Sequence, residues 1–73
     1  MNKNEIIDLL VLGRDRLYIT LIQVQKAIDL TRKAGLDEVA EMLMFKEEDI
    51  KKQKERASEI IQNFKETFYD DNE

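Results

Sequence analysis

Arg32-Lys33-Ala34-Gly35-Leu36-Asp37 is the stretch that decides the fold of this 73-residue chain. Its two cations suit the negative end of a helix dipole. The glycine can take the left-handed conformation that ends a helix, with the leucine packing back over the turn. The aspartate is a favoured N-cap, and acidic residues follow it, as they do at the start of a new helix. The stretch therefore predicts a helix, a very short turn and a second, antiparallel helix.

The helix boundaries follow from the residues on either side of this turn. Asn2, with Glu5 three residues later, is a capping-box-like start. We expect a first helix at about residues 3–33, a turn at about 34–37, a second helix at about 38–68 and an acidic tail at 69–73 that should fray. Gly13 is the weak point of the first helix, because glycine disfavours a helix interior. We expect a continuous or gently kinked helix there, and a break that makes three helices is the alternative.

The composition indicates one small all-α domain and excludes several kinds of active site. The residues are 42% hydrophobic and 38% charged, and the chain contains no Cys, His, Pro or Trp. This excludes a disulfide scaffold, a Cys/His zinc site and Cys–His or Ser–His–Asp catalysis. No glycine-rich phosphate loop is present either. We therefore expect a protein that is not an enzyme and that holds no cofactor or metal.

Neither charge nor hydropathy predicts a membrane protein. The formal net charge is −4, which favours solubility. The longest apolar stretch, residues 9–13, is far shorter than the roughly 20 residues that span a bilayer. No secretory signal pattern follows it. We therefore expect a cytoplasmic protein without a membrane partner.

Apolar residues recur in both helices at the heptad spacing of a coiled coil. In the first helix, position d holds Leu10, Leu17, Val24 and Thr31, and position a holds Arg14, Leu21 and Ile28. In the second helix, position d holds Leu36, Leu43, Ile50, Ala57 and Phe64, and position a holds Ala40, Glu47, Lys54, Ile61 and Phe68. The two helices should pack along these positions.

In the middle of the expected hairpin, the two facing segments differ in polarity. Residue i of the first helix should face roughly residue 70 − i of the second, so the apolar block 17–22 lies beside the polar segment 46–56. Ile50 is the one apolar residue of that segment, and it cannot cover the whole block. We therefore expect a homodimer or higher homo-oligomer that forms a four-helix bundle, and a different partner protein is the alternative. The expected oligomer interface is Leu10, Leu17, Tyr18, Leu21, Ile22, Val24 and Ile28.

A cluster of cations in mid-hairpin suggests a second possibility. A possible ligand or nucleic-acid patch consists of Arg14, Arg16, Lys52, Lys54 and Arg56. Acidic residues are interleaved with these cations, and no aromatic platform is expected among them. Arg14 and Lys54 occupy a positions, so an anion should lie beside them. Asp15 and Glu55 of the same chain are the nearest candidates. The tail residues Asp70 and Asp71 of a sister chain and a ligand phosphate are the others.

Two further clusters have ordinary structural explanations. The carboxylates Glu47 and Glu48 each precede a lysine by four residues, which predicts surface pairs with Lys51 and Lys52. Met42, Met44 and Phe45 form a soft apolar cluster after the turn, and we expect it to belong to the core.

These patterns favour a small non-catalytic protein-interaction or regulatory module that acts as a homo-oligomeric helical bundle. The alternative is an RNA- or DNA-binding hairpin that uses the basic patch. In length and expected architecture the chain resembles the small RNA-binding plasmid copy-number regulators, which is a likeness of shape alone. No motif assigns it to a family.

Overall fold

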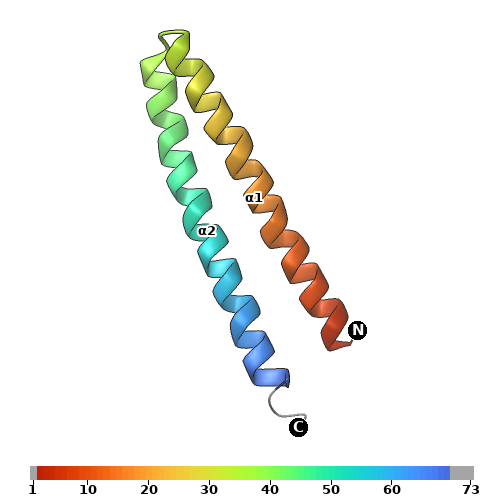
Figure 1. The fold of residues 1–73 in the computed structure, drawn as a ribbon. Coiled ribbons are helices and arrows are strands. Elements are labelled where there is room, and N and C mark those ends of the chain that lie inside the picture. Colours follow the sequence, from red (N-terminus) through yellow and green to blue (C-terminus); the bar gives the residue numbers. More distant parts are fainter. Residues whose placement is uncertain (1, 70–73) are drawn as a thin grey trace.

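The computed structural model describes residues 2–69 as two long antiparallel helices joined by a short turn (Figure 1). Helix α1 spans Lys3–Lys33 and helix α2 spans Asp37–Tyr69. The described residues contain no strand. The predicted all-α helical hairpin is confirmed, and α1 continues through Gly13 without a break. The acidic tail was expected to begin at residue 69, but Tyr69 is the last residue of α2; the rest of the expected tail, residues 70–73, lies outside the described residues.

The start of α1 is capped as its sequence predicts. The side-chain oxygen Oδ1 of Asn2 accepts a hydrogen bond of 2.9 Å from the backbone N–H of Glu5. In return, Nδ2 of Asn2 donates to Oε1 of Glu5 at 3.5 Å. The cap satisfies one of the backbone donors that the first turn of a helix leaves unpaired.

The turn between the helices is a Schellman motif, in which two backbone N–H groups fold back onto the last turn of α1. Gly35 has a φ of 76°. Its N–H donates to the carbonyl of Arg32 at 3.0 Å, and the N–H of Leu36 donates to the carbonyl of Thr31 at 2.8 Å. The left-handed glycine reverses the chain and sets α2 antiparallel to α1.

Helix α2 begins one residue earlier than the sequence predicts. Asp37 was expected to be the N-cap, but it is the first helical residue. The carbonyl of Leu36 accepts the N–H of Ala40 at 3.0 Å, so Leu36 supplies the first carbonyl of the helical ladder. The reason is the short Schellman turn, which leaves no residue between Leu36 and the helix. Asp37 still lies in the first turn, where its charge suits the helix dipole.

Burial follows the heptad positions along both helices. The buried apolar side chains are those of Ile7, Leu21, Ile28, Ala40, Ile50 and Ile61, and each occupies position a or d. Ile50 is 2% exposed, although it is the one apolar residue of the polar segment 46–56. The core is therefore a single seam between two helices.

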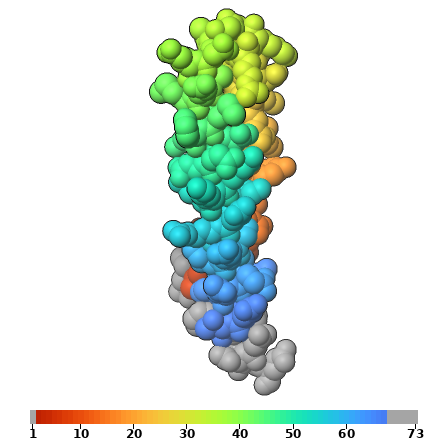
Figure 2. Space-filling model, turned by 90° about the vertical axis from the view of Figure 1, so that its left-hand side faces the viewer, coloured from red at the N-terminus to blue at the C-terminus, as the bar shows by residue number. Residues whose placement is uncertain are grey.

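The hairpin is a thin rod, and it exposes more surface than a compact domain of its size. Its Cα extents are 57 × 16 × 14 Å and its radius of gyration is 16.8 Å, whereas a compact chain of this length has about 11 Å. Figure 2 shows α2, in green to blue, running the length of the rod, with α1 in orange at its margin. Each helix has one neighbour, so each has one covered face.

The apolar cluster that follows the turn is not core. Met42 is 71% exposed and Phe45 is 79% exposed, so the expectation that they are buried is wrong. Both residues lie on the side of α2 that points away from α1, where a two-helix fold has nothing to cover them. Met44 is also exposed, although less so. Within residues 2–69, neither helix combines the length and apolarity that a membrane span requires.

We predict opposite effects for substitutions of the two glycines. A Cβ added at Gly13 meets nothing within 4 Å, and this position lies inside a helix. Gly13→Ala should therefore raise the free energy of unfolding by about 0.5–1 kcal/mol. Gly35→Val should lower it by at least about 1 kcal/mol, because a β-branched residue is strained at positive φ.

Urea unfolding at one fixed protein concentration measures both effects. A destabilising Gly13→Ala would contradict the first prediction and would indicate that another surface covers Gly13 in solution.

Candidate interaction surface

The side of α1 that points away from α2 carries a row of uncovered apolar side chains. Leu9, Leu12, Ile19 and Ile22 are 55%, 48%, 55% and 37% exposed, respectively. Their spacings of three and seven residues place them on one side of a helix. The buried residues of α1, such as Leu21 and Ile28, occupy the opposite side. We call the row Leu9, Leu12, Ile19 and Ile22 the outer face of α1.

The structure divides the seven residues expected at an oligomer interface between two locations. Leu21 and Ile28 are buried, and Leu10, Leu17 and Val24 are half-buried, all at seam positions that face α2 of the same chain. Tyr18 and Ile22 are exposed. The heptad pattern identified an apolar helix but could not tell which residues the chain covers by itself. The expected interface did not include Leu9, Leu12 and Ile19, although their heptad positions opposite a and d mark them as outward-facing.

Two cations of the expected basic patch share a hollow at the edge of the seam. The hollow has a volume of about 190 Å³ and is lined by Arg14, Asp15, Tyr18, Lys54 and Ser58. Nε of Arg14 lies 3.7 Å from Oδ1 of Asp15. Nζ of Lys54 lies 5.1 Å from the centroid of the Tyr18 ring. An anion and an aromatic ring thus stabilise the two cations from within the chain.

This arrangement corrects one expectation and supports another. An aromatic side chain does accompany the basic residues, because Tyr18 comes from the opposite helix and its distance in sequence hid the contact. Asp15, one of the two carboxylates expected beside the cations, does pair with Arg14.

The other three cations do not join this hollow. Lys52 and Arg56 line a separate hollow on α2, together with Asp49, Gln53, Glu55 and Glu59. Arg16 is exposed and lines neither hollow. The five cations therefore form no single patch, because helical rotation sends Arg14 and Lys54 into the seam and the others outward.

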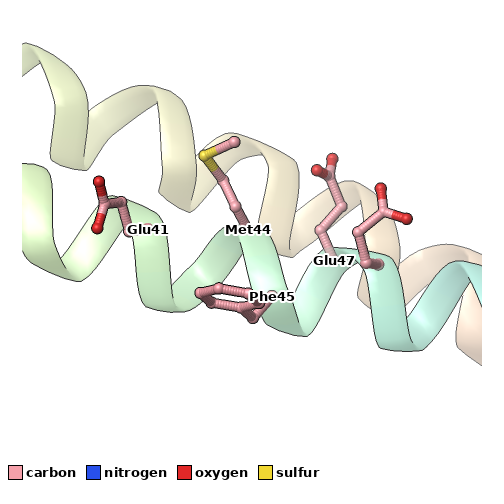
Figure 3. A pocket seen from close by; sticks show the side chains of 5 residues that line it. Glu41, Met44, Phe45 and Glu47 are labelled. Atoms are coloured by element: carbon pink, nitrogen blue, oxygen red, sulfur yellow. The ribbon is translucent and has the colours of Figure 1, made fainter.

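A further hollow, of about 430 Å³, lies on α2 near the turn and combines apolar and acidic groups. Its lining is Glu41, Met44, Phe45, Glu47 and Glu48. Figure 3 shows Glu41, Met44 and Glu47 extending toward the α1 side, whereas Phe45 lies on the other side of the α2 ribbon. Nη2 of Arg32 donates to Sδ of Met44 at 3.0 Å across the hairpin.

The lysine pairs expected near this hollow differ in the structure. Nζ of Lys51 lies 3.8 Å from Oε1 of Glu48, three residues earlier, and not beside Glu47. The pairs expected for Glu47 with Lys51 and for Glu48 with Lys52 are not formed within the described residues. On a helix surface, a lysine three residues after a glutamate, such as Lys51 after Glu48, reaches the carboxylate as well as a lysine four residues after it. Such exposed pairs contribute little to stability.

Comparison with known proteins gives no match: no family model, no curated protein and no solved structure is significantly similar to this chain. Among residues 2–69, no group of three or more acidic, histidine or cysteine side chains is placed to hold a metal ion.

We predict that Lys54→Leu stabilises the hairpin by about 1 kcal/mol. Lys54 is half-buried at a seam position and shares its hollow with the cation Arg14. A leucine there adds apolar burial and removes one of the two positive charges that line the hollow, and these gains exceed the exposed cation–π contact that is lost. Lys52→Leu is the matched control, because Lys52 is exposed; its effect should stay within about 0.5 kcal/mol. Urea unfolding at fixed protein concentration measures both variants.

If Lys54→Leu instead lowers the free energy of unfolding, this prediction is wrong. The contact between the Lys54 ammonium group and the Tyr18 ring would then be a major stabilising interaction between the helices.

Proposed function

We propose that the chain is a non-catalytic protein-interaction or regulatory module that acts as a homo-oligomeric helical bundle, at its smallest a homodimer that forms a four-helix bundle. The observation that carries this proposal is the outer face of α1. Four large apolar side chains lie in a row on the side of the helix that its own chain leaves uncovered. Moving a half-exposed Leu or Ile out of water stabilises a complex by about 1 kcal/mol.

The surface area of the chain supports association. The chain exposes 5792 Å², whereas a compact protein of this mass exposes about 4,700 Å². The difference, about 1,100 Å², exceeds the roughly 800 Å² that each partner buries in a standard interface. A second copy packed along the rod would bring the exposed area near that of a compact domain.

The small core supports association as well. The seam of this hairpin includes Arg14, Glu47 and Lys54, each half-buried at an a position where an apolar residue would pack better. A core of this size rarely stabilises a chain of fewer than about 80 residues without help, and oligomerisation is one common remedy. The outer face of α1 is already exposed, so a second copy can pack against it while the hairpin keeps its structure.

The nucleic-acid alternative receives less support from the geometry. Phosphate binding needs cations gathered on one surface. Here Arg14 and Lys54 lie in one hollow, and Lys52 and Arg56 lie in another among three carboxylates. Asp15 already occupies the space beside Arg14.

Substitution of Ile19 tests the proposal. Sedimentation equilibrium at micromolar concentration should give at least twice the chain mass for the wild type. Ile19→Lys should weaken the association at least tenfold, because it places a charge in the covered face. Phe45→Lys is the control, since Phe45 is even more exposed than Ile19 but lies on α2. Leu21→Lys would be a poor test, because Leu21 is 6% exposed within its own hairpin. A stably folded, monomeric wild type would refute the proposal.

A further inference from the structure

Along the outer face of α1 the apolar residues are spaced alike from both ends, and the charges at matching positions have opposite sign. From the N-terminal side it runs acidic residue, Leu9, Leu12, Asp15; from the C-terminal side it runs basic residue, Ile22, Ile19, Arg16. The acidic residue is Glu5 and the basic residue is Lys26. All these positions lie on the one side of α1 that points away from α2, since they fall at the heptad positions most distant from the seam.

We infer that this face binds a second copy of the chain with the two α1 helices antiparallel, so that residue i of one copy faces residue 31 − i of the other. The two-fold axis then passes between Asp15 and Arg16. Leu9 faces Ile22 of the other copy and Leu12 faces Ile19, so each large apolar side chain meets another. A two-fold interface of this kind is self-complementary, as a closed homodimer requires.

The charges select this orientation. In the antiparallel arrangement Asp15 meets Arg16 and Glu5 meets Lys26, and each of these pairs occurs twice. A parallel, in-register dimer would instead place each of these charges beside its own copy, and such like-charge contacts disfavour an interface. Arg16 and Lys26 form no ion pair within residues 2–69, so both are available to a partner.

Asp15 can pair with Arg14 of its own chain and with Arg16 of the second copy at the same time. It lies beside Arg14 of its own chain at 3.7 Å and is itself exposed. A carboxylate has two oxygens and can accept from two cations. The bound arrangement places the two α1 helices at the centre of the four-helix assembly, with the apolar row between them and an α2 helix on the outer side of each.

Distances between spin labels test the orientation. Lys33 lies near the turn and beyond the paired residues, so a label on Lys33→Cys leaves the interface intact; the sequence contains no cysteine of its own. At 1.5 Å per residue, the antiparallel register places the two labels about 50 Å apart. A label on Asn4→Cys should give about 35 Å. A parallel dimer would give short distances, below about 25 Å, at both positions.

A pair of charge reversals tests the face. Arg16→Glu should raise the dimer dissociation constant at least tenfold, because it sets two carboxylates against Asp15 and its copy. Arg56→Glu is the matched control: Arg56 is an exposed arginine at a similar level of the rod, but it lies on α2. Its dissociation constant should stay within about threefold of the wild type.

The inference rests on the proposed function, and the two can fail separately. Sedimentation of each labelled variant comes first: a monomer overturns both the proposal and the inference. A dimer with short distances at both labels, or one that Arg56→Glu weakens and Arg16→Glu does not, leaves the proposal standing and overturns the inference. Long distances together with selective weakening by Arg16→Glu support it.

Discussion

The constraint on which this structure depends is that a two-helix hairpin covers one face of each helix and no more. Gly35, at a φ of 76°, turns the chain back within a few residues and brings α1 and α2 side by side. The seam between them then buries Ile50 and Ile61 of α2 together with Ile7 and Leu21 of α1. The large apolar residues on the sides that point away from that seam, such as Leu12 and Ile19, face water, because the described chain supplies no third element.

The sequence predicted those parts of the structure that local chemistry decides. The cap at Asn2, the left-handed Gly35 and the continuous helix through Gly13 each depend on a few neighbouring residues, and each is found as expected. The start of α2 was misplaced by one residue, since the tight turn brought Leu36 directly into the helical ladder. The heptad positions also gave the seam correctly, because the 3.5-residue repeat identifies one face of a helix.

The candidate surface was harder to predict, because it depends on which of two possible neighbours covers a residue. Leu21 and Leu12 are equally apolar in sequence, yet Leu21 is buried by its own chain and Leu12 is exposed. Composition could not separate them, whereas the heptad position of each would have done so once the seam was fixed. The contact between Lys54 and Tyr18 was missed for a different reason: it joins two helices across a long separation in sequence.

The two helices differ in the polarity of their surfaces. Glu47 and Lys54 bring charge to the α2 side of the seam, and α2 exposes mainly charged residues elsewhere along its middle. Helix α1 carries fewer charges and more large apolar residues on both of its faces. A helix that is apolar all round is stable only when it is covered all round. Helix α2 covers one side of α1, and in the association that we propose the second copy would cover the other side and leave α2 as the layer that faces water.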